Sequence, residues 1–255
     1  MTSDQKIDAL TSGMTSIIGR LSRLDTYAHA IPVDVAGEVD AVHYLRSQLT
    51  PAAYIPPAGG WAAQYKTIAW LVAQILESRI EGLVLELGGG VSTVWLGLAL
   101  RRRGEGALVS LDHDDDYANK TRRGVEQQGL QSYVSVLHTP LATQEIRGES
   151  RVWYDLASLE VPDSSVGLLF VDGPPATSEP LARDPAFVML RSKLRDGALV
   201  VLDDVDRPGE QQILENWTAA AASDGSTLSH IERLGRSVVL RFDAAQRNQT
   251  PPQSL

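Results

Sequence analysis

The sequence predicts an α/β fold built on a mostly parallel β-sheet. Between residues 83 and 222, short apolar runs alternate with helix-length segments, and after residue 226 two more strand-like runs follow with four residues between them. The alternation is typical of βα units around a buried parallel sheet, whose strands are covered on both faces. The short final connection requires an antiparallel pair, because parallel strands need a longer crossover.

The composition is that of a globular protein with room for one sizeable α/β domain in 255 residues. The formal net charge of −9 disfavours a nucleic-acid partner, since such proteins carry a basic surface for phosphates. The chain has no cysteine, which excludes disulfides, thiolate zinc sites and cysteine nucleophiles. No signal-peptide pattern and no apolar stretch of about 18 residues is found, so we expect a cytoplasmic protein without a membrane partner.

The sequence pattern predicts a helical extension over residues 1–60, followed by one more helix before the sheet. Apolar residues recur at three- and four-residue steps from Ile7 to Tyr27, and helical stretches follow at Val39–Leu49 and Ala62–Ser78, the last of which leads into the sheet. The first amphipathic face could pack on its own chain, cover an active site or pair with a second copy. Packing within the chain is favoured, and a homodimer through these helices is an alternative that the pattern allows.

The main domain is expected over residues 61–243, and residues 244–255, with their Asn, Gln and Pro, are expected to be disordered. The predicted parallel strands are Leu83–Leu87, Ala107–Leu111, Val134–Leu137, Val166–Val171 and Ala198–Leu202. The predicted helices between and after them are Ser92–Arg102, Tyr117–Gln128, Ala182–Leu194 and Glu210–Ala222. The antiparallel pair is Thr227–Glu232 with Ser237–Phe242.

Three glycines, Gly88, Gly89 and Gly90, stand where the first predicted strand turns into a helix. Glycines at such a turn let the backbone approach a ligand, and the free N–H groups of the helix N-terminus can meet its polar part. Thr93 occupies the place of the last glycine in a GxGxxG pattern, so this is a poor dinucleotide fingerprint.

Together with Glu86 before the glycines and Asp112 at the end of the next strand, this loop resembles the first two motifs of the class I S-adenosylmethionine-dependent methyltransferases. The resemblance runs from about Gly60 to Phe242 and implies a Rossmann-like, seven-stranded sheet with an antiparallel C-terminal hairpin strand. It implies S-adenosylmethionine as cofactor, with Glu86 and the glycine loop facing its methionine part. Ser92 would be a candidate for the methionine carboxylate, and Asp112 would hold the ribose hydroxyls. The alternative is a glycine turn that only permits tight packing.

Two further segments border this expected cofactor site. His113 follows Asp112, and the stretch containing His138 and Thr139 stands where family members contact the adenine, although a surface loop is the alternative. His113 is a candidate for cofactor binding, and either His113 or His138 could serve as a catalytic base, with a loop histidine as the alternative for each. In the acidic run that follows, we expect Asp115 or Asp116 to cap the next helix.

The fourth and fifth predicted strands end in Asp172 and in Asp203-Asp204. Carboxylates that converge at this edge of a sheet repel one another unless a cation lies among them, and Mg²⁺ suits such all-oxygen ligands. The pattern resembles the metal-dependent O-methyltransferases of the catechol, caffeoyl-CoA and antibiotic-sugar types. That resemblance implies the three aspartates as metal ligands, with Asp172 and Asp204 in catalysis. The alternative is that Asp172 touches substrate or cofactor directly, while the pair caps a helix without metal.

The catechol-type enzymes carry a lysine base shortly after their first metal aspartate, whereas Gly173-Pro174-Pro175 stands here, so no base is identified. Arg183, Arg207 and Glu210 lie near the same strand ends, where they could recognise a polar substrate or form salt bridges. Three aromatic residues, Trp61, Trp153 and Tyr154, could wall a pocket or serve in packing.

The expected function is methyl transfer from S-adenosylmethionine to a hydroxyl oxygen of a small-molecule acceptor, with metal assistance as an option. One alternative is a non-catalytic binding module with a methyltransferase-like fold. Another, an NAD-dependent oxidoreductase, is disfavoured by the incomplete glycine pattern and by the antiparallel end of the sheet.

Overall fold

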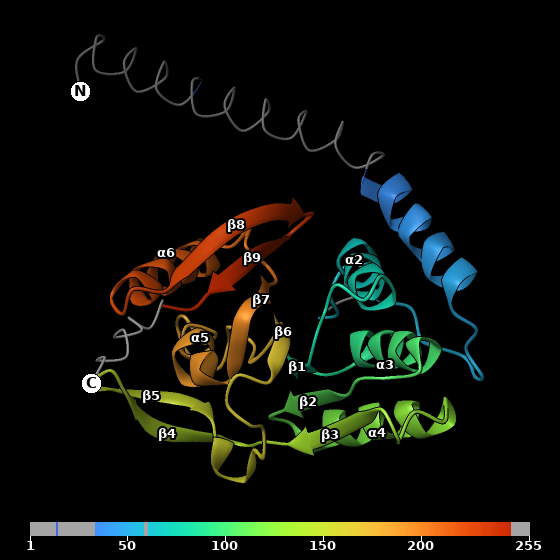
Figure 1. Cartoon of the computed structure of the whole chain (residues 1–255), viewed down its shortest axis with the longest axis horizontal. Coiled ribbons are helices and arrows are strands. Elements are labelled where there is room, and N and C mark those ends of the chain that lie inside the picture. Colours follow the sequence, from blue (N-terminus) through green and yellow to red (C-terminus); the bar gives the residue numbers. More distant parts are fainter. Residues whose placement is uncertain (1–13, 15–33, 59–60, 246–255) are drawn as a thin grey trace, which may run out of the picture.

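The computed structural model describes residue 14 and residues 34–58 and 61–245. They form a seven-stranded sheet in the order β3-β2-β1-β6-β7-β9-β8, beside a separate two-stranded sheet of β4 and β5 (Figure 1). The strands from β3 to β7 in that order pair in parallel, whereas β9 is antiparallel to both β7 and β8. The predicted Rossmann-like fold with an antiparallel C-terminal pair is confirmed.

The strands are β1 Leu83–Leu87, β2 Leu108–Asp112, β3 Val134–His138, β4 Leu141–Ile146, β5 Glu149–Tyr154, β6 Val166–Val171, β7 Leu194–Leu202, β8 Thr227–Leu234 and β9 Ser237–Asp243. The helices are α2 Tyr65–Leu76, α3 Val91–Arg103, α4 Asp115–Gln127, α5 Pro185–Leu190 and α6 Pro208–Ala222, with short 3₁₀ helices at Leu156–Ser158 and Arg191–Lys193. A further helix covers residues 34–48.

The sequence-based prediction differs from the structure most at the segment before β7, which begins at Leu194 rather than Ala198, and at the β4–β5 hairpin. The helix expected over Ala182–Leu194 is shorter, because α5 begins at Pro185 and passes into a 3₁₀ turn before β7. The β4–β5 hairpin was not predicted. Its turn is formed by Arg147 and Gly148, both with positive φ (55° and 78°), as a two-residue hairpin turn requires.

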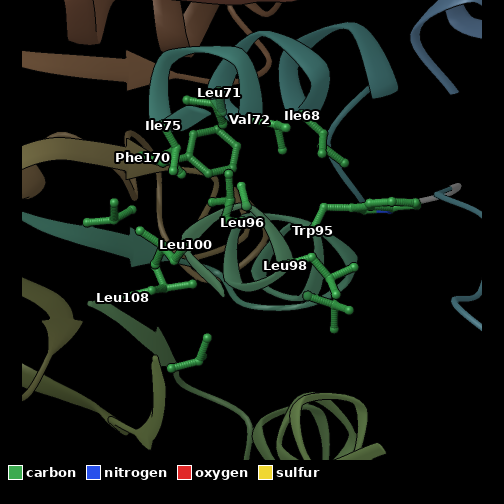
Figure 2. Close-up of a cluster of buried hydrophobic side chains, with 14 of the residues drawn as sticks. Ile68, Leu71, Val72, Ile75, Trp95, Leu96, Leu98, Leu100, Leu108 and Phe170 are labelled. Carbon is green, nitrogen blue, oxygen red and sulfur yellow. The ribbon is translucent and has the colours of Figure 1, made fainter. Parts of the chain in front are cut away.

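Different helices cover the two faces of the sheet. Val84 and Leu168 belong to the core cluster formed with α2, α3 and α4, whereas their neighbours Leu85 and Leu169 belong to the cluster formed with α5, α6 and β5. Successive side chains of a strand point to opposite faces, so this alternation buries the sheet on both sides. In the first cluster, Phe170 of β6 lies among side chains of α2 and α3 (Figure 2).

The helix over residues 34–48 packs on the main domain. Its residues Ala41 and Leu45 are buried in the same core cluster as α2 and α3. The helical pattern of Ile7–Tyr27, and with it the predicted homodimer contact, lies outside the described residues except for Met14. The predicted domain limits at residues 60 and 243 stay predictions.

Among the described residues, no helix combines the length and apolar character needed to cross a membrane.

The carboxyl ends of the central strands lie side by side and are joined through the main chain. The Asp172 N–H donates to the Leu87 carbonyl at 2.9 Å, and the Asp203 N–H donates to the Val171 carbonyl at 3.1 Å. The loops that follow β1, β6 and β7 are therefore neighbours, although they are far apart in the sequence.

Candidate active site

Glu86 lies under the glycine loop and organises it. Its carboxylate is fully buried; the Ser92 hydroxyl donates to Oε1 at 2.6 Å and the Thr93 hydroxyl donates to Oε2 at 2.5 Å. Thr93 Oγ1 also accepts from the Gly90 N–H at 2.8 Å, so one relay joins the carboxylate to the loop. Burial raises the pKa of Glu86, and the bonded hydroxyls counteract part of this shift.

The three glycines differ in the space that a side chain would find at each position. Gly88 has φ +89°, and a Cβ on it would lie 2.9 Å from the Asp172 carbonyl carbon. A Cβ on Gly89 would lie 2.5 Å from Ser110 Oγ, whereas a Cβ on Gly90 would meet nothing within 4 Å. The first two glycines permit close packing, and Gly90 faces open space in which a ligand could approach the backbone.

We expect Gly88→Ala to lower the free energy of unfolding by about 1–3 kcal/mol, because a side chain would be held at positive φ against the Asp172 main chain. Thermal denaturation measures the effect. Gly90→Ala is the matched control and should leave the melting temperature nearly unchanged, since its Cβ enters open space. Equal melting temperatures for the two variants would contradict this assignment.

Asp112, His113 and Thr139 come together at the ends of β2 and β3. Asp112 is 5% exposed, and its Oδ1 accepts from the Asp114 N–H at 3.0 Å, with His113 Nδ1 at 3.5 Å from the same oxygen. In the described part of the chain, no hydrogen bond reaches Asp112 Oδ2. The Thr139 N–H donates to the Asp112 carbonyl at 2.7 Å. These predicted cofactor residues therefore share one corner of the site.

The cap of α4 differs from the prediction. Asp114, rather than Asp115 or Asp116, accepts from the Tyr117 N–H at 2.9 Å. The acidic residues after it lie in the first helical turn, where negative charge is favourable.

The three predicted metal ligands also come together. Asp172, Asp203 and Asp204 each offer a carboxylate oxygen within 4.8 Å of the others. Burial, with the nearby Asp203 carboxylate adding to it, raises the pKa of Asp172 well above its usual value, and Arg183 counteracts this shift. Asp204 has φ +63°, so its backbone is held in the left-handed region at this site.

Three arginines contact this carboxylate cluster: Arg183, Arg207 and Arg236. Arg183 Nη2 lies 3.2 Å from Asp172 Oδ1 and 3.1 Å from Asp204 Oδ2. Arg207 Nη1 lies 2.8 Å from the same Asp204 oxygen, and Arg236 Nε lies 3.2 Å from Asp204 Oδ1. Both oxygens of Asp204 therefore face guanidinium groups.

Asp203 is fully buried, and both of its carboxylate oxygens also accept hydrogen bonds. The Ser237 hydroxyl donates to its Oδ1 at 2.6 Å, and Arg236 Nη2 donates to its Oδ2 at 3.1 Å. The positive counter-charges of this cluster come from Arg236 in the turn before β9 and from Arg183 and Arg207, whose salt bridges were one of the two expected roles.

The unpredicted hairpin brings Tyr154 to the site. The ring is fully buried, and its hydroxyl has no hydrogen-bond partner among the described residues. A Cβ on Gly173 would lie 2.5 Å from that hydroxyl, and the His113 ring packs edge-on at 6.4 Å. The Arg147-Gly148 turn was the sequence signal that could have revealed the hairpin.

Comparison with known proteins agrees with this geometry. A family model described as "Methyltransferase domain" matches residues 85–205, a span that holds the glycine loop and the three aspartates. Comparison with curated proteins gives no significant match.

The fold is similar to that of solved structures that include two O-methyltransferases. The O-methyltransferase TomG from Streptomyces achromogenes, involved in tomaymycin synthesis and solved with SAM, is 20% identical, with 82% of this chain and 90% of that chain covered and a TM-score of 0.53. Cofactor-bound Rv0187 from MTB is 17% identical, with 83% and 91% covered and a TM-score of 0.52. An O-methyltransferase from Bacillus cereus in complex with SAH is 19% identical, with 82% and 90% covered and a TM-score of 0.50. The domain match over residues 85–205 and the strand order both agree with the class I methyltransferase fold that the sequence motifs resemble.

Proposed function

We propose that this enzyme transfers the methyl group of S-adenosylmethionine to a hydroxyl oxygen of a small-molecule acceptor. One observation carries the proposal: the glycine loop after β1 packs directly against Asp172 at the end of β6. A cofactor loop and a carboxylate with a raised pKa therefore lie next to each other at the edge of the sheet where ligands bind in such folds.

The residues present fit the cofactor. The open space at Gly90 leaves room for it beside the N-terminus of α3, and Asp112 Oδ2 is free to accept from ribose hydroxyls. The Ser92 hydroxyl already donates to Glu86, so the methionine carboxylate would meet the main-chain N–H groups at the start of α3 instead, with His113 and Thr139 on the adenine side. Glu86 supports these groups from below, since its carboxylate is fully buried.

Asp172 is the group best suited to take the acceptor's proton. When bound, the cofactor supplies the methyl group from its sulfonium sulfur and leaves as S-adenosylhomocysteine. The acceptor oxygen forms the new bond to carbon while Asp172 receives the hydroxyl proton, and a carboxylate with a raised pKa is a stronger base. Arg183 joins Asp172 to Asp204, which makes Asp204 a positioning residue, and His113 is the second candidate for the base.

Metal assistance, which the sequence pattern suggested, does not fit the donor set. Both oxygens of Asp203 and both oxygens of Asp204 already accept from hydrogen-bond donors or face guanidinium groups. A hard cation needs free oxygens. The proposed transfer therefore contains no metal-dependent step.

Calorimetric titration of S-adenosylmethionine and S-adenosylhomocysteine tests the cofactor assignment. We expect wild type to bind both ligands and Asp112→Ala to bind them about 10- to 100-fold more weakly, the effect of losing hydrogen bonds to a charged group. Asp116→Ala, which changes an exposed carboxylate in the same acidic run, is the control and should bind as wild type does. Failure of well-folded wild type to bind either ligand would overturn the proposed function.

A further inference from the structure

The carboxylate cluster of Asp172, Asp203 and Asp204 is charge-balanced by the protein itself. Three buried acidic groups that share one site are costly unless positive charge is supplied. Arg183, Arg207 and Arg236 supply three such charges, and each lies within 3.2 Å of a cluster carboxylate. The electrostatic reason for a metal ion at this position is therefore removed.

Arg183 is held firmly in place. Its side chain is 4% exposed, and its guanidinium donates to main-chain carbonyls as well as to carboxylates. Nη1 donates to the Asp203 carbonyl at 3.0 Å, and Nη2 donates to the Asp172 carbonyl at 2.7 Å. A buried guanidinium with these partners cannot swing out without leaving carbonyls and carboxylates unpaired.

We propose that Arg183 performs the charge-neutralising role of a divalent cation in this site, so that the cluster is closed to metal ions and methyl transfer is metal-independent. The claim that methyl transfer is metal-independent rests on the proposed function. The claim that the cluster binds no metal ion rests only on the contacts among this chain's own residues. Arg236 and Arg207 complete the closure by occupying Asp203 and the remaining positions on Asp204.

The inference narrows the chemistry of the acceptor. A catalytic metal would bind two oxygens of its substrate and would so favour vicinal diols or catechols. Without that requirement, the acceptor needs only the one hydroxyl that receives the methyl group. Arg183 acts as a positioning residue, because it orients Asp172 and lowers the cost of its negative charge.

Metal binding can be measured without knowing the acceptor. We expect titration with Mn²⁺, followed by paramagnetic resonance and calorimetry, to show no saturable site in wild type at millimolar concentration. Chelator should leave both the melting temperature and the affinity for S-adenosylhomocysteine unchanged. A stoichiometric Mn²⁺ site in wild type that Asp204→Asn removes would overturn the inference.

Removing an arginine should create a metal site. We expect Arg183→Met to gain saturable Mn²⁺ binding, because Asp172 and Asp204 lose a shared positive partner. Arg207→Gln provides the same test from a half-exposed position if the buried variant fails to fold, and it should gain weaker binding. Arg241→Gln removes an exposed arginine paired with Asp243 and should gain none. Absence of any gain in folded Arg183→Met and Arg207→Gln would contradict the inference.

The two proposals fail in different ways. A wild-type protein that binds no S-adenosylhomocysteine but also no Mn²⁺ would refute the proposed function and leave the closed cluster standing. A wild-type protein that binds S-adenosylhomocysteine and needs Mn²⁺ to do so would refute metal independence and leave methyl transfer standing.

Discussion

Asp172→Asn is expected to slow methyl transfer severely while making the ligand-free protein more stable at neutral pH. Loss of a general base typically costs about 10²- to 10⁴-fold in rate. Asparagine keeps the size of the side chain, so the loss of rate reports the missing carboxylate rather than a cavity. Turnover of S-adenosylmethionine to S-adenosylhomocysteine measures the rate once an acceptor is in hand, and the melting temperature measures the stability without one.

The gain in stability has a defined pH dependence. Burial beside Asp203 raises the pKa of Asp172 in the folded state, so the folded protein holds a proton there that the unfolded chain releases at lower pH. The contribution of Asp172 to the stability of the wild-type protein is fully present below the pKa that Asp172 has in the unfolded chain. This contribution is lost as the pH rises to the pKa that Asp172 has in the folded protein. The difference in melting temperature between Asp172→Asn and wild type should therefore grow from acidic to neutral pH. The rate of the wild-type enzyme should fall as the pH drops through the same folded pKa.

Asp163→Asn is a control from the segment just before β6, the strand that ends at Asp172. Asp163 is exposed, and Lys193 beside it lowers its pKa, so its charge is favourable in the folded state. We expect Asp163→Asn to bring no gain in stability and no loss of rate. An Asp172→Asn variant that is less stable than wild type at neutral pH, or that keeps its rate, would contradict the assignment.

The sheet was predictable because the local sequence of a buried strand is an apolar run that can be recognised directly. The run Val166–Val171 is buried along its whole length, and the sequence shows this as an uninterrupted apolar segment. The β4–β5 hairpin has no such run, since β4 combines partly exposed residues with only one buried side chain, Ile146. A search for apolar runs therefore passes over it, and only the Arg147-Gly148 turn marks it.

The carboxylates of the site were predictable, and Arg183 and Arg207 were expected near them as possible salt-bridge partners, but Arg236 was not. Strand ends place Asp172, Asp203 and Asp204 at one edge, a consequence of parallel topology that the sequence reveals. Arg236 reaches Asp203 from the turn between β8 and β9, a pairing that depends on the antiparallel end of the sheet and on side-chain direction. Patterns along the sequence contain no such information, so the charge balance of the cluster became visible only in three dimensions.

Glu86→Ala is expected to cost about 3 kcal/mol or more in the free energy of unfolding and to weaken S-adenosylmethionine binding as well. The buried hydroxyls of Ser92 and Thr93 would lose their acceptor, and each unsatisfied buried group costs about 1–3 kcal/mol. The Gly90 N–H, which Thr93 holds, would lose its fixed orientation. Chemical denaturation and calorimetric titration measure the two effects on the same preparation.

Glu86→Gln separates the roles of shape and charge. Because burial already raises the pKa of Glu86, a neutral amide of the same size should recover most of the stability that alanine loses. Glu81→Ala removes an exposed glutamate just before β1 and should stay within about 0.5 kcal/mol of wild type. If Glu86→Ala lost cofactor affinity without losing stability, Glu86 would contact the methionine part directly, as the motif resemblance implies. Loss of both together means that the carboxylate acts on the cofactor by holding the loop.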